Sequence, residues 1–307
     1  MNWMYKALLQ HVFSNIPFGE HLRYFFQKYV TRSLPATDAS FISIVSFAKS
    51  HIEAVQQYYH RPLGKATFYE YGAGWDMIVP LTFYALGVER QILVDIRNLL
   101  RIELVNDTID KHQRIVLDLA FQRKPDRYIG VGVGWCNFLA SLKEYYGIDY
   151  RAPCDALHTG LEAGSINCIT STNTLEHIPI QAIQAILREC HRLLRDDGLM
   201  SSLIDYQDHY SYFDSGISAY NFLQYSDKVW RFFSPALHYQ NRLRHHDYLD
   251  LFWEAGFEII EERLKEGTEA DLKVIQQLPL ARRFRAYSLP ELAVRNALIV
   301  VRKRDII

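Results

Sequence analysis

The sequence has few cysteines, and no two of them have a spacing typical of metal sites. The four are Cys136, Cys154, Cys168 and Cys190. The Cys-x-x-Cys pairs that mark many structural zinc sites are missing. A chain of 307 residues can bury a core without disulfide bonds. We therefore expect four reduced thiols in a protein of the cytoplasm.

Long apolar runs are also missing. No stretch of 18 apolar residues occurs, so the sequence predicts no membrane span. The first ten residues carry one lysine and no sustained apolar region, which argues against a signal peptide. This absence supports the same cytoplasmic localisation.

Neither sign of charge is in excess. The chain has 34 basic and 35 acidic residues, and its net charge is −1. Such a balance provides no overall positive field for a phosphate backbone, so we expect no nucleic acid as the main partner. The chain is 49% apolar and 22% charged, as in ordinary globular proteins.

Strand and helix patterns alternate over most of the chain. Seven strand-like segments lie at residues 67–71, 91–96, 147–151, 165–171, 199–204, 257–262 and 297–302. This alternation predicts an α/β fold with a doubly wound, mostly parallel, Rossmann-like sheet of seven strands. Residues 1–65 show helical periodicity only, and they either cap a binding site or pack on the sheet. We therefore divide the chain into a helical cap, 1–65, and a catalytic domain, 66–307.

A glycine turn follows the first predicted strand. It reads Glu70-Tyr71-Gly72-Ala73-Gly74-Trp75-Asp76. Glycines let a backbone approach a ligand closely. A nicotinamide dinucleotide would bring a diphosphate near Glu70 and Asp76, and two like charges about 4 Å apart repel by roughly 4 kcal/mol at an effective dielectric constant of about 20. S-adenosylmethionine carries a sulfonium and an ammonium instead, which acids would attract.

Further candidate cofactor residues follow the second and third predicted strands. Asp95 and Ile96 end the second strand, and a carboxylate there can accept hydrogen bonds from both ribose hydroxyls. Asp155 and Ala156 lie where an adenine amino group could donate. The glycine run at residues 130–134 lacks a preceding strand and a following acid, so we interpret it as a bend between helices.

Taken together, these segments resemble the class I S-adenosylmethionine-dependent methyltransferases from about residue 68 to residue 303. Glu70-x-Gly72-x-Gly74 is similar to the family's first motif, Asp95 to its ribose acid and Asp155-Ala156 to its adenine-side motif. Residues 171–178, which include Asn173, resemble the segment that lines the methionine end. The helix at 179–195 and the turn Asp196-Asp197-Gly198 resemble the approach to the fifth strand, and Gly198 suits a left-handed helix end.

The resemblance implies an enzyme that uses S-adenosylmethionine to methylate a small molecule. Two features depart from the family pattern. Asp76 stands where glycine is common, and about 50 residues separate Asp95 from the third strand. The alternatives are a non-catalytic interaction protein with this fold and, less favoured, an NAD-dependent oxidoreductase.

Aromatic residues are dense between the fifth strand and the next helix. Residues 206–240 contain eleven Phe, Trp and Tyr residues, more than twice the density of the whole chain. We interpret this segment as a helical lid insertion. Its rings either line an acceptor pocket or pack the insertion onto the sheet.

The expected chemistry is methylation of a hydroxyl or carboxyl oxygen, as on a sugar or glycan, a peptide or a specialised metabolite. A hydroxyl must lose its proton, and histidine is suited to accept it near neutral pH. His209 is the first candidate base, oriented by Asp205 or Asp208, and His177 is the second. Arg242 and Arg244 could meet an acidic acceptor or be solvated.

A metal is not expected. Some related quinone-pathway O-methyltransferases carry a metal-binding Glu-x-x-Glu-His, whereas this sequence reads Asn173-x-x-Glu176-His177. Two remaining ligands make a poor site for a hard divalent cation. The identity of the acceptor and the oligomeric state do not follow from the sequence.

Overall fold

One mixed sheet of seven strands organises the molecule. The computed structural model describes the chain except residues 1, 15–18, 31–32, 118, 131 and 305–307. The strand order is β3-β2-β1-β4-β5-β7-β6. All neighbouring pairs are parallel except those of β7, which runs antiparallel to β5 and β6. The strands are β1 (Thr67–Tyr71), β2 (Arg90–Val94), β3 (Ile148–Arg151), β4 (Ile166–Thr172), β5 (Leu194–Asp205), β6 (Phe257–Lys265) and β7 (Asn296–Lys303).

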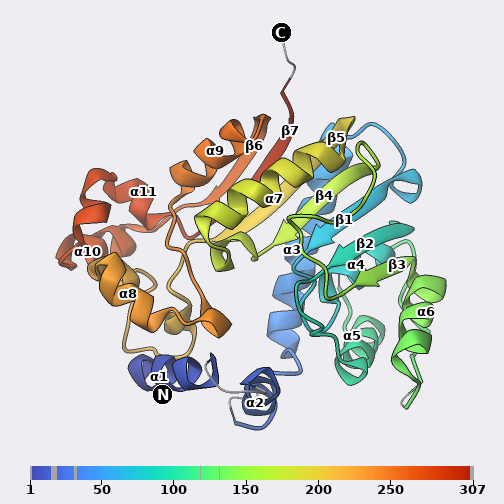
Figure 1. Ribbon diagram of the computed structural model, residues 1–307, viewed down its shortest axis with the longest axis horizontal. Helices are drawn as coiled ribbons and strands as arrows, with labels where there is room; N and C mark the ends of the chain where they lie inside the picture. The colour runs from blue at the N-terminus through green and yellow to red at the C-terminus, as the bar shows by residue number, and fades with distance from the viewer. Residues whose placement is uncertain (1, 15–18, 31–32, 118, 131, 305–307) are drawn as a thin grey trace.

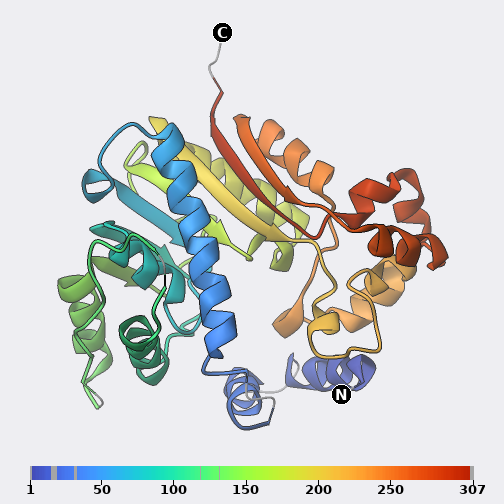
Figure 2. The same ribbon diagram turned by 180° about the vertical axis from the view of Figure 1, so that it is seen from behind.

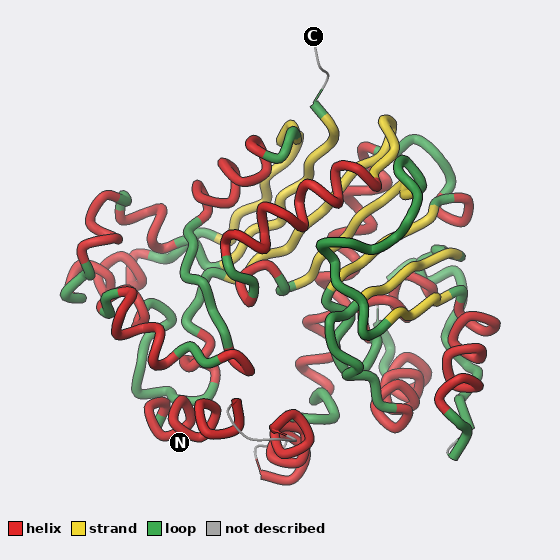
Figure 3. Tube along the Cα trace, viewed as in Figure 1, coloured by secondary structure: helices red, strands yellow, loops and turns green. Residues whose placement is uncertain are grey.

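Helices cover both faces of this sheet. Figures 1 and 2 show α7 and α9 on one face and α3 on the other. Figure 3 shows the strands as a single central layer between these helices. The α-helices are α1 (Trp3–Ser14), α2 (Gly19–Phe25), α3 (Asp38–Tyr58), α4 (Ile78–Ala85), α5 (Ile102–Arg114), α6 (Trp135–Tyr146), α7 (Ile180–Leu193), α8 (Asp227–Phe233), α9 (His245–Glu254), α10 (Glu269–Gln277) and α11 (Leu289–Ala293).

The core lies on the two faces of the sheet. On one face, apolar residues of α7 and α9 pack with β4, β5 and β7, among them Ile183, Leu187 and Phe252. On the other face, residues of α3 and α4 pack against the same strands, among them Ile52, Val55 and Phe83. The central strands are buried on both faces, and their polar residues, such as Thr170, Ser201 and Ser202, are buried with them.

The predicted fold class and all seven strand positions are confirmed. Two details differ from the expectation. β5 begins at Leu194, five residues before its predicted start, because Leu194 already pairs with Ile166 before a bulge in β4. Gly198 therefore lies inside β5 and not at a left-handed helix end. A Cβ on Gly198 would lie 2.7 Å from the Asn167 carbonyl oxygen, so close approach explains the glycine.

The leading segment has two different parts. α3 packs along the sheet, and its buried His51 donates to or accepts from Ser201 of β5 at 2.8 Å. α1 instead lies beyond the carboxyl ends of the parallel strands, beside α8 and residues 236–238 of the aromatic segment, and α2 lies next to α1 (Figure 1). Of the residues predicted to form a helical cap, those of α3 therefore pack on the sheet.

None of the helices in the described part of the chain has the length and apolar character that crossing a membrane requires.

Candidate active site

A cavity of about 580 Å³ opens at the carboxyl edge of the sheet. Five stretches of chain line it: the glycine turn, the ends of β2 and β3, the segment from the end of β4 to α7, and residues 236–239. Its lining residues are Tyr71, Gly72, Gly74, Trp75, Val94, Asp95, Ile96, Arg97, Leu99, Cys154, Asp155, Ala156, Leu157, Asn173, Thr174, His177, Ile178, Pro179, Ala182, Ile186, Ala236, Leu237, His238 and Tyr239. The volume is in the range of small-ligand and cofactor sites.

The glycine turn has a backbone that only glycine adopts easily. Gly72 has φ +81° and Gly74 has φ +72°. A Cβ on Gly72 would lie 2.5 Å from Thr174 Cγ2, whereas a Cβ on Gly74 would meet no atom within 4 Å. Gly72 therefore permits close packing of two turns, and Gly74 exposes its backbone to the cavity. This arrangement fits a ligand that approaches the main chain.

Asp95 is fixed at the end of β2 and faces the cavity. One carboxylate oxygen accepts a hydrogen bond from the Gly74 amide at 3.3 Å, and the other accepts from the Arg97 amide at 3.0 Å. These bonds join the glycine turn to the end of β2. A carboxylate held in this way can accept hydrogen bonds from a ribose, as the sequence predicts.

Glu70 and Asp76 are not among the residues that line this cavity. Glu70 is 3% exposed and accepts a hydrogen bond from Thr172 Oγ1 at 3.1 Å. Burial raises the pKa of Glu70 to about 7. Asp76 accepts from the Ile78 amide at 3.4 Å, and burial raises its pKa to about 6.

The other predicted cofactor residues all line the cavity. They are Gly72, Gly74, Ile96, Asp155, Ala156 and Asn173. Asn173 has φ +48°, and its amide donates to the Leu203 carbonyl at 2.9 Å, which fixes the turn after β4. Asp155 caps its own turn by accepting from the Leu157 amide at 2.9 Å.

Several residues that line the larger cavity were not among the site residues predicted from the sequence. Trp75 adjoins the glycines, and Tyr24 of α2 stacks on it with ring centroids 5.5 Å apart. His238 and Tyr239 come from a turn more than sixty residues beyond Asn173 in the chain. The position of Trp75 beside the motif was a usable signal, and Tyr239 belongs to the aromatic segment, but no local pattern marks His238.

A second cavity of about 210 Å³ lies next to the first, and both are lined by His177 and His238. Its other walls come from α1, from the start of the aromatic segment and from residues near the end of α2. The remaining lining residues are Lys6, Leu9, Gln10, Phe13, Phe26, Gln27, Ser33, His209, Tyr212 and Phe213.

The candidate catalytic residues meet at this second cavity. His209 Nε2 lies 3.3 Å from Asp205 Oδ2, although the pair lacks hydrogen-bond geometry. Asp205 also accepts from the Tyr212 hydroxyl and from the Gln207 amide. Asp208 instead accepts from Asn221 and from the Tyr210 amide. Of the two acids considered, Asp205 is therefore the one beside the His209 ring.

His177 lies against His209, with ring centroids 4.8 Å apart. Its Nδ1 is 2.7 Å from the Tyr239 carbonyl oxygen. Because a carbonyl oxygen only accepts, Nδ1 carries the proton of this bond. The contact joins the turn after β4 to the far end of the aromatic segment.

Most rings of the aromatic segment pack against one another and against α1. Tyr210, Tyr220, Phe222 and Trp230 are buried in one cluster with Trp3. By contrast, Tyr212, Phe213 and Tyr239 line the two cavities. The two roles considered for the segment, packing and pocket, thus belong to different residues within it.

Arg242 and Arg244 serve neither of the roles considered for them. Arg244 is fully buried and donates to the carbonyl oxygens of Tyr206, Leu292 and Val294. Arg242 donates to two carbonyl oxygens of residues 222–225 and to Asp227. Arg242 thus holds the aromatic segment to itself, whereas Arg244 joins the start of that segment to residues 292–294.

Comparison with known proteins identifies the family. The profile of the methyltransferase domain family matches residues 106–262, more than half of the chain. The match begins after the glycine turn, so the description of that turn comes from the structure. A comparison with curated proteins found no match.

Solved structures with a similar chain path include three methyltransferases. One is the 1,6-didemethyltoxoflavin-N1-methyltransferase of Burkholderia thailandensis, which was solved with 1,6-didemethyltoxoflavin and S-adenosylhomocysteine. Its sequence is 14% identical to this chain. The match covers 94% of this chain and 92% of that one, with a TM-score of 0.47. An S-adenosylmethionine-dependent methyltransferase of Methanosarcina mazei is 12% identical, with 82% and 97% covered and a TM-score of 0.45. A TehB-like one of Corynebacterium glutamicum is 10% identical, with 93% and 97% covered and a TM-score of 0.43.

The family match decides for a methyltransferase over the dinucleotide oxidoreductase considered from the sequence. The strand order, with β7 antiparallel at its place between β5 and β6, agrees with that assignment. The chain belongs to the methyltransferase domain family and is a class I methyltransferase that uses S-adenosylmethionine as its methyl donor.

Proposed function

We propose that the enzyme transfers the methyl group to an oxygen of a small molecule, a hydroxyl or carboxyl group of a sugar, peptide or specialised metabolite. The larger cavity holds the cofactor, and the smaller one holds the acceptor. The observation that carries this proposal is the wall common to both cavities, which contains His177 and His238. An acceptor in the smaller cavity would face the methyl group across that wall.

The cofactor end of the proposal uses Asp95, the glycine turn, Asn173 and the pair Asp155-Ala156. Bound S-adenosylmethionine supplies an electrophilic methyl group on a sulfonium. The protein contributes mainly by alignment, and positioning of this kind is worth about 7–11 kcal/mol. His209, His177 and Asp205 are the candidate groups at the reacting end.

The proposal includes a cover over the two cavities, formed by α1, α2 and the aromatic segment. α1 forms part of the acceptor cavity through Lys6, Leu9 and Gln10, and α2 stacks on the glycine turn through Tyr24. We infer that these helices and the aromatic segment 206–240 cover the reacting groups and exclude water from them.

A transfer assay with isotopically labelled cofactor tests this function. Pools of small hydroxylated metabolites, glycans and carboxylic acids serve as acceptors, and NMR of the product identifies the methylated atom. We expect a methyl ether or methyl ester. A product methylated on nitrogen or carbon contradicts the oxygen assignment.

A pair of neighbouring substitutions on α1 tests the acceptor cavity. Leu9 lines the cavity, whereas Leu8 does not. Leu9→Trp fills the cavity, so the acceptor KM should rise about tenfold or more while affinity for S-adenosylhomocysteine stays unchanged. Leu8→Trp is the matched control and should leave KM unchanged. Equal KM values in both variants would place the acceptor elsewhere.

A further inference from the structure

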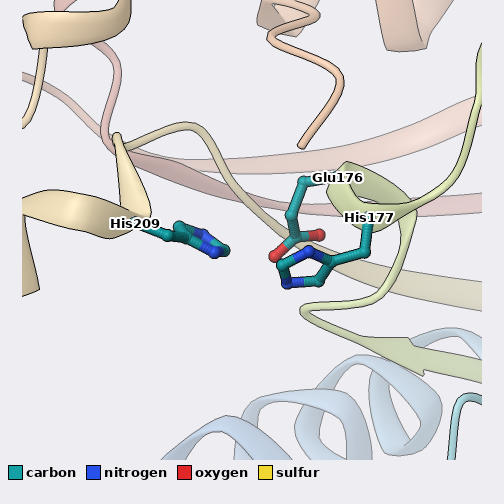
Figure 4. Close-up of side chains that lie close together, drawn as sticks. All are labelled: Glu176, His177 and His209. Carbon is teal, nitrogen blue, oxygen red and sulfur yellow. The ribbon is translucent and has the colours of Figure 1, made fainter. Parts of the chain in front are cut away.

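Three potential metal ligands come together at the ends of two adjacent strands. Glu176 and His177 belong to the 3₁₀ turn Leu175–His177 after β4, and His209 begins the 3₁₀ turn His209–Tyr212 after β5. Because β4 and β5 are neighbours, these turns meet. One donor atom from each residue lies within 4.8 Å of the other two. Figure 4 shows the carboxylate and the two rings pointing toward one another.

Glu176 supplies the second observation. Its side chain is 2% exposed, and neither carboxylate oxygen has a hydrogen-bond partner of normal geometry among the described residues. A buried carboxylate without a partner is costly unless a cation or a proton neutralises it. The unpartnered oxygens are aimed at the two histidines.

A hydrogen bond orients the imidazole of His177. Its Nδ1 donates to the Tyr239 carbonyl oxygen at 2.7 Å, so the lone pair of the neutral ring is on Nε2. A carbonyl partner of this kind commonly holds a metal-binding histidine in place. Asp205 Oδ2 lies beside the His209 ring, 3.3 Å from Nε2, without the geometry of a hydrogen bond.

The chemistry of this donor set selects the class of metal. Two imidazoles and one carboxylate suit zinc or a related divalent transition metal, whereas Mg²⁺ and Ca²⁺ prefer oxygen ligands alone. Three protein ligands also leave a coordination position open, as in catalytic zinc sites. His177 and His209 both line the smaller cavity, so an open position would face the acceptor.

We propose that Glu176, His177 and His209 bind one divalent transition metal ion of the zinc class, whose open position takes the acceptor oxygen. The role of the ion rests on the proposed function, but its binding does not. A metal-bound hydroxyl loses its proton to solvent water more easily. The oxygen then forms a bond to the methyl carbon, and the carbon–sulfur bond breaks with its electron pair going to sulfur. The products are the methylated acceptor and S-adenosylhomocysteine, and His209 acts as a ligand in place of a base.

The proposed set of metal ligands differs from the Asn173-x-x-Glu176-His177 motif considered in the sequence. Asn173 lies in the wall of the cofactor cavity, and the third donor is His209 from the next strand end. No local spacing relates His209 to Glu176, which is why the sequence predicted no metal.

Titration of the untagged, chelator-treated full chain with Zn²⁺ tests the binding. Calorimetry should give one ion per chain, and Co²⁺ should give the visible absorption of a nitrogen–oxygen site. Glu176→Gln and His209→Ala should each weaken binding at least tenfold. The exposed His246 is the matched control, and His246→Ala should bind as the unchanged chain does. Unaltered affinity in Glu176→Gln and His209→Ala, or no binding at all, overturns the proposal.

Affinity for S-adenosylhomocysteine distinguishes the loss of a metal ligand from the loss of folding. The variants should bind this product normally, which shows that they are folded. If Glu176→Gln or His209→Ala loses product binding, His209→Gln replaces it, and the same tenfold loss is required. Metal binding without oxygen methylation supports the site and contradicts the proposed function. Oxygen methylation that survives complete chelation but is lost in His209→Ala overturns the metal role and supports His209 as a base.

Discussion

At the scale of single residues, Asp95 lines the larger cavity and joins the glycine turn to the end of β2. Asp95→Ala should weaken affinity for S-adenosylhomocysteine by about 1.5–3 kcal/mol, the range for hydrogen bonds to a charged group. This corresponds to roughly a 10- to 150-fold rise in Kd, which isothermal titration can measure. Asp250, exposed on α9, is the control, and Asp250→Ala should leave Kd unchanged. An unchanged Kd in Asp95→Ala would show that the ribose lies elsewhere.

Glu70 gives a prediction about pH. Its folded-state pKa of about 7 lies above its ordinary value of 4.5, because burial disfavours the charged form. The folded state therefore holds a proton between pH 4.5 and 7 that the unfolded state releases. The free energy of unfolding should fall as pH rises through this window, by about 3 kcal/mol for this group alone.

Glu70→Gln should remove that slope. Glutamine imitates the protonated acid, so the variant should keep its stability from pH 4.5 to 7 while the parent chain loses it. Urea unfolding at several pH values measures the difference between the two chains. Parallel pH profiles would mean that Glu70 is ionised without penalty, for instance through a bound cation.

At the scale of elements, α2 is tied to both the cofactor site and the sheet domain. Tyr24 stacks on Trp75 of the glycine turn and donates from its hydroxyl to Glu103 of α5 at 2.7 Å. The cavity also takes Ala236 to Tyr239 from the far end of the aromatic segment. A bound cofactor should therefore order both segments.

Hydrogen exchange with and without S-adenosylhomocysteine measures this ordering. Amides in α2 and in residues 236–239 should exchange more slowly when the product is bound, since covering segments are drawn from the less stable parts of a fold. Tyr24→Ala should abolish the change in α2, whereas Tyr29→Ala, on the exposed part of the same region, should not. If only amides of the glycine turn exchange more slowly, α2 has a structural role and does not cover the cofactor.

At the scale of the whole molecule, the cofactor choice should appear in stability. A ligand that binds only the folded chain stabilises it by about 2.7 kcal/mol at a concentration 100 times its Kd. S-adenosylmethionine and S-adenosylhomocysteine should thus raise Tm by several degrees, whereas NAD should not. Differential scanning calorimetry checks this, and a rise with NAD would contradict the reading of the glycine turn.

The sequence predicted those parts of the site that lie next to one another in the chain. The predicted residues Gly72, Gly74, Asp95, Asp155 and Ala156 lie within five residues of the end of a strand, and parallel strands bring such positions to one edge. The seven strands were predictable because strand-like segments alternate with helical segments along the chain.

Tertiary structure decided the direction in which side chains face and which distant turns meet. Glu70 adjoins the glycines in sequence, but strand alternation buries it against Thr172. Arg242 and Arg244 are residues that often bind anions, but here their guanidinium groups donate hydrogen bonds to buried carbonyl oxygens. His238 reaches both cavities, and His209 meets Glu176, through contacts between segments separated by tens of residues. Local sequence determines backbone periodicity and turn chemistry, whereas these contacts depend on how whole elements pack, which no short window of sequence contains.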